Sequence, residues 1–381
     1  MRIGIDASRA VVGEKTGTET YSYHLIRELL RLDSPHDYTL YFNHPPPSGT
    51  FPSAPNVADR VMPQPRLWTH GRLSLEMATN PPDVLFVPAH VLPLVRPKRT
   101  VVTIHDLGYL HYWNTHPFLR RWYLHLATRR DAHDATRVIA DSDATKKDLV
   151  ERYGVAAQKT TVVYPGVDPR FRAPEDPAEA GRTALRYGLE QPYFLFLGTL
   201  HPRKNIVGML RAYASVKERL RGPRPHAFAV VGKAGWRADE IKAEADKSGA
   251  CTLGYVDFED MPHLIGAATA LVLVSFYEGF GLPALEAMAC GTPVIVSNTS
   301  SLPEVVGDAG LLVDPHNERE IADALVSVAE DSGLREKLRE RGLARAREFS
   351  WEKAARQVLR ILEDAAGDRP SEGRAEARLD R

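Results

Sequence analysis

Short apolar runs recur along the chain and alternate with stretches in which apolar residues repeat at helical spacing. Runs of this kind are typical of strands that are buried on both faces of a parallel sheet. Helices are expected between them, for example at residues 20–32 and 205–220, and this alternation predicts an α/β protein. The predicted strands are residues 1–6, 84–87, 100–104, 137–140, 193–197, 227–231, 270–274 and 293–296.

The predicted strands fall into two groups on either side of a Pro-rich and charged stretch, residues 164–177. A chain of 381 residues also exceeds what one hydrophobic core usually serves. We therefore predict two doubly wound, Rossmann-like domains that face a cleft. The expected units are residues 1–170, residues 171–350, a terminal helix at 351–364 that packs back toward the N-terminal domain, and a disordered tail at 365–381.

Composition narrows the range of partners and of compartments. Lys+Arg and Asp+Glu both number 49, so no global charge favours nucleic acid as a partner. The 2 cysteines are too few for a disulfide framework or a cysteine-based zinc site. The sequence shows no signal-peptide pattern and no uninterrupted apolar run of about 18 residues. These features predict a cytoplasmic protein, free or attached to the inner face of a membrane.

Residues 276–295 carry the densest chemical signal. A buried strand leads into a loop with two glycines and then into a helix that has Pro283 in its first turn. Such a loop directs backbone N–H groups and the positive end of a helix dipole at one point, which suits a phosphate group. The helix is expected over 282–290 and should end at Gly291, a residue typical of the position after a helix.

Two carboxylates, Glu278 and Glu286, accompany this phosphate site. A carboxylate beside a phosphate is unfavourable unless it binds hydroxyl groups, so the pair indicates a sugar and a ribose next to a diphosphate. The alternative is that Glu278 is an ordinary loop acid and Glu286 a solvated helix residue.

Arg203 and Lys204 stand at the start of a predicted helix, after a buried strand. When a sugar–phosphate bond breaks, the departing nucleoside diphosphate gains charge that a metal or fixed cations must neutralise. These two side chains can supply that charge in place of a metal. The alternative is a solvated basic turn.

With these motifs the chain resembles retaining glycosyltransferase family 4, whose members have the two-domain glycosyltransferase-B fold. The segment from Glu278 to Glu286 is similar to the E-x₇-E motif of that family. Thr199 departs from the family pattern, because many members have Arg directly after the strand-ending glycine. Further similar strings occur in the family's order, and the last two resemble its mannosyltransferase-like members. They are residues 198–205, residues 142–149 with 163–168, residues 301–305 and residues 310–315.

The resemblance implies a role for each residue of the second domain's site. Glu286 is expected to bind the ribose. Glu278 is expected to act in catalysis by holding hydroxyls of the transferred sugar. The remaining expected ligands are Arg203, Lys204, Gly281 and Leu282 for the donor diphosphate, and the backbone of Tyr255 and Val256 for the base.

The first domain contributes fewer candidates. Gly17 lies in a loop, residues 13–20, that is similar to a glycine-rich family loop near the donor diphosphate, although an ordinary strand-to-helix turn has the same composition. His105 and Asp106 follow a buried strand at its carboxyl end, where open α/β sheets bind ligands. By the resemblance, His105 is a catalytic residue that faces the donor sugar, and Asp106 orients its ring or meets the acceptor hydroxyl. A purely structural histidine is the alternative.

The triplet Asp141-Ser142-Asp143 has the spacing of a metal-binding D-x-D motif. Because it follows a strand and precedes an amphipathic stretch, we expect Ser142 or Asp143 to cap a helix instead. No metal ion and no other cofactor is therefore expected.

Residues 118–130 are basic and aromatic. A stretch of this kind can lie on an anionic membrane. Alternatively, it is a helix with one face in the core and one basic face in solvent.

Together these features predict a retaining, metal-independent glycosyltransferase. The expected donor is a nucleotide diphosphate hexose, with GDP-mannose as first choice. The expected acceptor is a saccharide or lipid-linked saccharide in the synthesis of cell-envelope polysaccharide or another glycoconjugate. Two classes of alternative stay open here: a nucleotide-sugar epimerase or phosphorylase on the same fold, and a non-catalytic nucleotide-sugar-binding protein.

Overall fold

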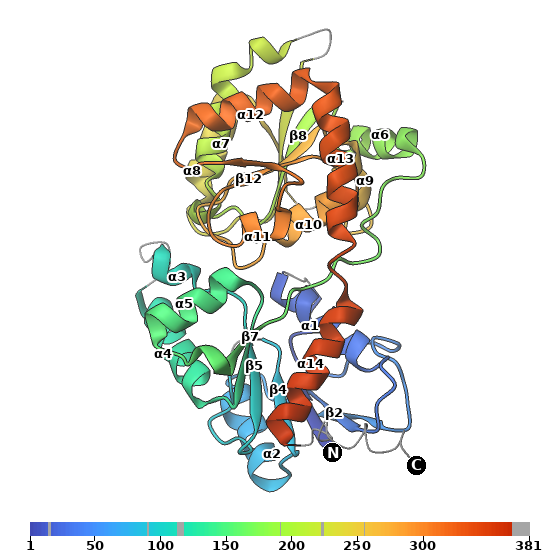
Figure 1. Ribbon diagram of the computed structural model, residues 1–381, viewed down its shortest axis with the longest axis vertical. Coiled ribbons are helices and arrows are strands. Elements are labelled where there is room, and N and C mark those ends of the chain that lie inside the picture. The colour runs from blue at the N-terminus through green and yellow to red at the C-terminus, as the bar shows by residue number, and fades with distance from the viewer. Residues whose placement is uncertain are drawn as a thin grey trace, which may run out of the picture.

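The chain forms two lobes, each built on one parallel sheet with helices packed on its faces (Figure 1). The computed structural model describes residues 1–13, 17–89, 91–112, 118–190, 192–221, 225–254 and 256–367; for residues 118–120 and 221 it describes the backbone alone. The predicted fold class, two doubly wound Rossmann-like domains, is confirmed.

The N-terminal sheet has the strand order β3-β2-β1-β4-β5-β6-β7. Its strands are β1 (Arg2–Asp6), β2 (Asp37–Phe42), β3 (Val57–Val61), β4 (Val84–Val87), β5 (Thr100–Ile104), β6 (Arg137–Ala140) and β7 (Thr160–Val162). The helices are α1 (Gly17–Leu29), the π-helix η1 (Thr69–Leu73), α2 (Ser74–Thr79), α3 (Gly108–His111), α4 (Phe118–Asp134), α5 (Asp143–Tyr153) and the 3₁₀ turn η3 (Ala157–Lys159). The order reverses between β1 and β4, and ligands of open α/β sheets bind outside the carboxyl ends of strands at such a point.

The C-terminal sheet repeats this plan with the order β10-β9-β8-β11-β12-β13, which reverses between β8 and β11. Its strands are β8 (Tyr193–Leu197), β9 (Ala227–Val231), β10 (Cys251–Gly254), β11 (Ala270–Leu273), β12 (Val294–Ser297) and β13 (Leu311–Val313). The helices are α6 (Pro177–Arg186), the 3₁₀ turns η4 (Pro202–Lys204) and η5 (Arg219–Arg221), α7 (Ile206–Val216), α8 (Ala238–Ser248), α9 (Met261–Ala267), α10 (Leu282–Ala289), α11 (Leu302–Val306), α12 (Glu318–Glu330) and α13 (Ser332–Ala346).

The last helix, α14 (Trp351–Ala366), returns from the C-terminal lobe and packs beside α1 (Figure 1). Its apolar face joins the core cluster that contains β1 and α1. The chain crosses between the lobes twice, near Gly166 and before Trp351. A Cβ atom at Gly166 would lie 2.1 Å from the backbone nitrogen of Trp351, so these two segments are in contact. The helix extends two residues into the predicted tail, and residues 368–381 lie outside the described part of the chain.

The apolar pattern predicts every interior strand except β2 and misses the strands at the sheet edges. Each predicted strand coincides with an observed strand to within one residue at either end, and all of these strands have neighbours on both sides. The missed strands are β2 and the edge strands β3, β7, β10 and β13. An edge strand such as β3 is mostly exposed, so it carries polar side chains and produces no continuous apolar run.

Helix positions agree with the pattern better than helix ends do. The helix predicted at 20–32 is α1, which begins at Gly17, and the helix predicted at 205–220 ends as α7 at Val216. Gly291 follows α10 with a φ of 73°, the left-handed conformation expected after a helix.

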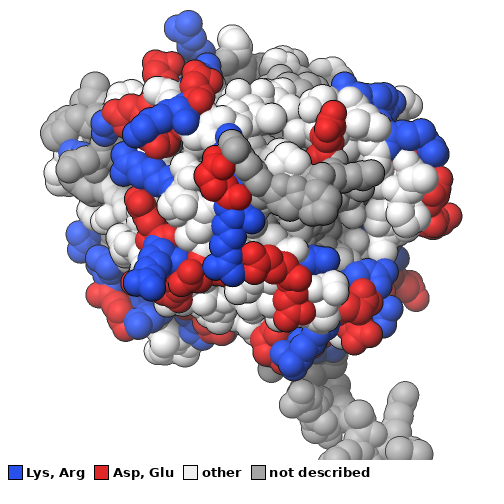
Figure 2. All heavy atoms as spheres, turned by 90° about the horizontal axis from the view of Figure 1, so that it is seen from above, with Lys and Arg blue, Asp and Glu red and all other residues white. Residues whose placement is uncertain are grey.

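Figure 2 shows the outer end of the C-terminal lobe, where basic and acidic side chains alternate over the surface. Over the described residues of this face, no large patch of one sign is visible. The mixture matches the equal numbers of basic and acidic residues in the chain.

Candidate active site

A cleft of about 1420 Å³ lies between the two lobes. Loops that follow interior strands of both sheets open into it, as expected for two doubly wound domains. The predicted site residues that line it together are Gly17, His105, Asp106, Arg203, Lys204, Val256, Glu278, Gly281, Leu282 and Glu286. Tyr255, the remaining one, lies outside the described residues.

Lys204 and Glu278 form a buried ion pair on the C-terminal side of the cleft. The Lys204 ammonium donates to both carboxylate oxygens of Glu278, at 2.6 and 2.8 Å, and the Ser275 hydroxyl donates to one of them at 2.7 Å. Burial alone would raise the pKa of Glu278, but Lys204 and Arg203 hold it below its ordinary value. The carboxylate is therefore ionised, and a phosphate that approaches Lys204 competes with Glu278 for the ammonium.

Arg203 links this pair to the neighbouring loop. Its guanidinium donates to the carbonyl oxygen of Tyr277 at 2.6 Å. The next residue but one, Asn205, has a φ of 54°, and its amide donates to the carbonyls of Val274 and Pro315 at 3.1 and 2.7 Å. Sequence analysis did not single out Asn205, although Asn is one of the few residues that favour this left-handed conformation. Asn205 therefore fixes the turn that carries Arg203 and Lys204, here called the cationic turn, to the end of β11.

The N-terminal end of α10 opens into the cleft. Gly281 precedes the helix with a φ of 99°, and a Cβ atom there would lie 2.5 Å from a methyl group of Leu302, so only glycine fits. Gly281, Leu282 and Pro283 all line the cleft, which makes the unpaired N–H groups of this helix end available to an anion. From the other lobe, a Cβ atom at Gly17 would lie 3.8 Å from Leu282 Cδ1, so the two predicted diphosphate loops face each other.

Glu286 lines the same cleft from α10, near Asp168 and Arg170 in the segment that joins the lobes. Burial and the charge of Asp168 raise the pKa of Glu286 to about 8, against the opposing effect of Arg170. At neutral pH its carboxyl group is therefore mostly protonated, so it donates one hydrogen bond and accepts others. A vicinal diol such as that of a ribose offers the complementary set of groups.

His105 is held by its own lobe at both ring nitrogens. Nδ1 lies 2.5 Å from Asp141 Oδ2, and Nε2 lies 2.8 Å from the carbonyl oxygen of Pro88, to which it can only donate. Burial alone would lower the pKa of His105, but Asp141 outweighs it and raises the value. Asp141, and not Asp106, therefore orients the ring; Asp106 instead accepts the backbone N–H of Gly108 at 2.9 Å.

Ser142, the middle residue of the D-x-D triplet, caps a helix as expected. The Ser142 hydroxyl accepts the backbone N–H of Thr145 at 3.1 Å and caps α5, which confirms the predicted cap. Among the described residues, no group of three or more His, Cys, Asp or Glu side chains is arranged to hold a metal ion. The contact of Asp141 with His105 was not predicted, because the two residues are 36 positions apart.

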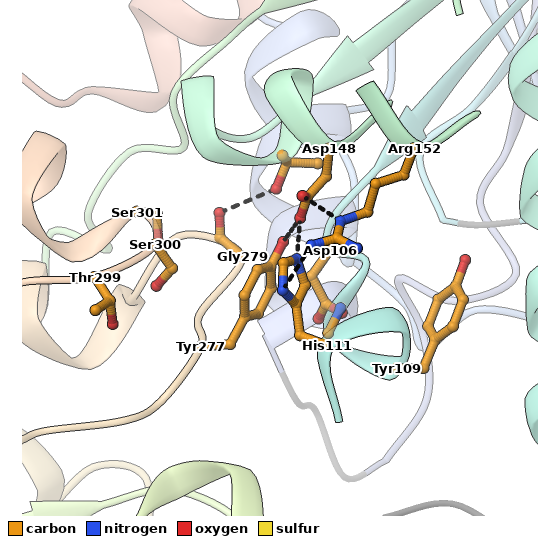
Figure 3. A network of polar contacts seen from close by, with 12 residues as sticks. Asp106, Tyr109, His111, Asp148, Arg152, Tyr277, Gly279, Thr299, Ser300 and Ser301 are labelled. Carbon is orange, nitrogen blue, oxygen red and sulfur yellow. Dashed lines mark hydrogen bonds and ion pairs between the residues drawn. The ribbon is translucent and has the colours of Figure 1, made fainter. Parts of the chain in front are cut away.

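The lobes touch at the edge of the cleft, where α5 meets the loop that carries Glu278. A Cβ atom at Gly279 would lie 2.2 Å from the carbonyl oxygen of His105, so the two backbones are in close contact. The Thr145 hydroxyl donates to the Gly279 carbonyl at 3.4 Å. Figure 3 shows Gly279 beside a larger polar network that includes Tyr277 and Asp148. The carboxylate of Glu304 accepts the backbone N–H groups of Asp143 and Ala144 at 2.9 and 3.1 Å. The lobes are therefore in direct contact at this edge of the cleft.

Comparisons with known proteins place the chain in a family. Residues 15–171 match the family described as glycosyltransferase family 4, and residues 180–345 match glycosyl transferases group 1. The chain is 36% identical over 271 residues to O-antigen chain mannosyltransferase B of Escherichia coli, which covers 69% of this chain and 70% of that protein. It is 33% identical over 251 residues to a D-inositol 3-phosphate glycosyltransferase of Nocardioides sp., which covers 61% of this chain and only 55% of that protein.

A solved structure shows the same fold. Anabaena HepE, determined in complex with UDP-glucose, has a TM-score of 0.74 to this chain at 18% identity, covering 96% of this chain and 100% of that one. The chain therefore belongs to the group 1 and family 4 glycosyltransferases and has the glycosyltransferase-B fold.

Proposed function

We propose that this glycosyltransferase transfers mannose from GDP-mannose, with retention of anomeric configuration and without a metal ion. The observation that carries the proposal is the Lys204–Glu278 pair beside the open N-terminus of α10. It puts a cation for the diphosphate and a carboxylate for sugar hydroxyls a few ångströms apart. The likeness to O-antigen chain mannosyltransferase B favours mannose as the transferred sugar.

The cationic turn supports a reaction without a metal ion, because it supplies positive charge to the cleft. Arg203 and Lys204 are adjacent, line the cleft and are each fixed by contacts to the loop at 276–279. Preorganised cations and helix N–H groups of this kind stabilise a departing diphosphate without reorganisation. Addition of EDTA should therefore leave the rate nearly unchanged, and activity that EDTA removes and Mn²⁺ or Mg²⁺ restores would contradict this part of the proposal.

The ribose is assigned to Glu286 and the base to the backbone around Tyr255 and Val256. Because the ribose changes little during transfer, its contacts affect KM more than kcat. Glu286→Leu, which removes the donor and the acceptors of the protonated carboxyl group, should raise the donor KM and weaken binding of free GDP by about 1–2 kcal/mol, the worth of one strong hydrogen bond. Unchanged GDP binding in this variant would remove the assignment.

Retention implies that the nucleotide leaves and the acceptor hydroxyl attacks on the same face of the sugar. Glu278 is occupied by Lys204 and Ser275, which makes it a poor nucleophile for attack on the opposite face. This occupation supports direct transfer over a covalent intermediate on Glu278.

The acceptor is proposed to be a saccharide or lipid-linked saccharide of the cell envelope, presented at a membrane surface. Trp122, Tyr123 and Leu126 on α4 are 41%, 49% and 59% exposed, and Tyr123 also lines the cleft. The first three residues of the predicted membrane stretch, 118–120, have side chains outside the described part. No helix in the described residues is long and apolar enough to span a membrane.

Binding to vesicles tests the membrane contact. The double variant Trp122→Ala with Leu126→Ala should lose most of its binding to vesicles that contain anionic lipid. Trp236→Ala is the matched control, since Trp236 is 46% exposed on the other lobe. Equal binding of the wild type and the double variant would exclude α4 as the contact.

A donor panel tests the transfer itself. GDP-mannose, UDP-glucose and GDP-glucose should be offered with mannosyl acceptors, and the products identified by mass and by NMR. We expect the highest kcat/KM with GDP-mannose. Highest turnover with UDP-glucose would contradict the donor assignment. Epimerisation of the donor without an acceptor, or binding of the donor without any transfer, would contradict the proposed reaction.

A further inference from the structure

A cluster of polar side chains outside the cleft joins the two lobes. Tyr277 precedes Glu278 in the C-terminal lobe, and its hydroxyl donates to Asp148 Oδ2, on α5 of the N-terminal lobe, at 2.8 Å. Asp148 also lies 2.7 Å from His111 Nε2 and accepts from the Arg152 guanidinium at 3.1 Å. Figure 3 shows the Tyr277 side chain reaching across to these residues.

Tyr277 and Asp148, at the centre of the cluster, are buried, whereas His111 and Arg152 at its rim are partly exposed. Tyr277 is 4% exposed, and its ring stacks on that of His111 with the centroids 4.5 Å apart. Burial alone would raise the pKa of Asp148, but its hydrogen bonds with His111 and Tyr277 hold it below its ordinary value. An ionised, buried carboxylate needs its donors, so the Tyr277 hydroxyl is a strong contact between the lobes.

The main chain of the same residue holds a donor-site cation. The Tyr277 carbonyl accepts the Arg203 guanidinium at 2.6 Å, and the next residue is Glu278, which pairs with Lys204. A Cβ atom at Gly108 would lie 3.1 Å from Arg203 Cδ and 3.2 Å from Tyr277 Cδ1, so the N-terminal lobe packs against both side chains. Neither Tyr277 nor Asp148 is among the residues that line the cleft.

We propose that Tyr277 and Asp148 are positioning residues for glycosyl transfer. Their hydrogen bond closes the lobes on the loop at 276–279 and so fixes Arg203 and Glu278 against the N-terminal wall of the cleft. The inference rests on the proposed function, because it concerns the same transfer. Glycosyl transfer would then require a contact outside the donor-binding residues. Arg203 and Glu278 would reach their working positions only when Asp148 of the other lobe holds Tyr277.

Tyr277→Phe tests the proposal, because it removes one hydroxyl and keeps the ring stack. We expect kcat to fall roughly ten- to hundredfold, the range for a hydrogen bond to a charged group. The Kd of free GDP should change much less, since most predicted nucleotide contacts, among them Lys204, Leu282 and Glu286, lie in the C-terminal lobe and are not altered by the substitution. Tyr187→Phe is the matched control: the Tyr187 hydroxyl donates to Asp260 at 2.8 Å, inside one lobe. An unchanged kcat in Tyr277→Phe, or an equal loss in the control, would overturn the proposal.

A double-mutant cycle separates positioning from general destabilisation. Asp148→Ala should lower kcat by about as much as Tyr277→Phe, and the double variant should be no worse than either single variant. Asp148→Asn, which keeps an oxygen acceptor, should recover part of the loss. Fully additive losses in the double variant would overturn the coupling.

Lobe closure is measured independently of activity, by pulsed EPR between one spin label on each lobe with GDP bound. We expect a short, narrow distance distribution in the wild type and a longer, broader one in Tyr277→Phe. If the wild type transfers no sugar from any donor, the proposed function fails, while this measurement still decides the present inference. Identical distributions in the two proteins would overturn it.

Discussion

The two walls of the cleft are built in different ways. On the C-terminal wall, most predicted ligands come from two short strings, residues 198–205 and 276–286, each directly after an interior strand. On the N-terminal wall, the lining residues follow β1, β2, β4, β5 and β6 or lie in η1, α1, α3 and α4. A site assembled from contiguous strings can be recognised as a motif, whereas one assembled from many separate elements cannot.

The walls also differ in charge. The C-terminal wall presents Arg203 and Lys204, with Glu278 fixed between them. The N-terminal wall presents Asp6, Asp106 and Asp141 beside Arg9, and the first and last of these carboxyl groups are held by Ser8 and His105. Because fixed cations suit a diphosphate, we expect the donor diphosphate at the C-terminal wall.

The largest effect is expected at Lys204. Lys204→Met removes the cation nearest the predicted diphosphate and leaves Glu278 buried without its main partner. We expect kcat/KM to fall on the order of a thousandfold, at the upper end for loss of one preorganised group. Steady-state kinetics with Lys217→Met as control checks this, since Lys217 donates to the Ser248 carbonyl at 3.0 Å away from the cleft. Similar losses in both variants would contradict the role.

The next-largest loss of activity is expected for the substitution of Glu278. Glu278→Gln should lower kcat about a hundredfold, because the sugar loses a charged partner as the transition state forms. Because the substitution also frees Lys204 from its ion pair, binding of free GDP should be unchanged or tighter. Calorimetry with GDP, paired with kinetics, measures both effects. Loss of GDP binding in Glu278→Gln would mean that this residue, and not Glu286, holds the nucleotide.

The third effect concerns His105 on the N-terminal wall. Asp141→Asn removes the charge that raises the pKa of His105 and weakens the contact that fixes its ring. We expect a lower pKa for His105 by NMR titration and a loss of kcat of about tenfold, as for one neutralised hydrogen bond. Asp143→Asn is the neighbouring control and should change neither. An unaltered titration of His105 in Asp141→Asn would rule out the pair.

The contrast between the walls also explains which parts of the fold and of the site can be predicted from the sequence. The interior strands other than β2 were predicted because continuous apolar runs report burial on both faces, and Gly281 and Glu286 were singled out because loop and helix are contiguous. The Lys204–Glu278 pair spans 74 positions and the Tyr277–Asp148 contact spans 129, so neither follows from local periodicity. The ring contact of Asp141 to His105 depends on the neighbouring β5 and β6, an order that only the sheet topology reveals.

The smallest effect is on stability, through Glu286. Its pKa is about 8 in the folded chain against an ordinary value of 4.5, so between these pH values the folded state holds a proton that the unfolded state has released. The wild type therefore loses stability as pH rises through this window, and Glu286→Gln does not. We expect similar melting temperatures near pH 5 and a higher one, by roughly a few degrees, for Glu286→Gln at pH 9. A constant difference across this range would contradict the raised pKa.

The central claim is that the cations of the C-terminal wall replace a metal in a retaining mannosyl transfer. The most direct test is one NMR measurement of the product formed from GDP-α-mannose and a mannosyl acceptor in the presence of EDTA. We expect an α-linked mannoside, formed as fast as without the chelator. A β-linked product, or a product that appears only when a divalent metal is restored, would contradict it.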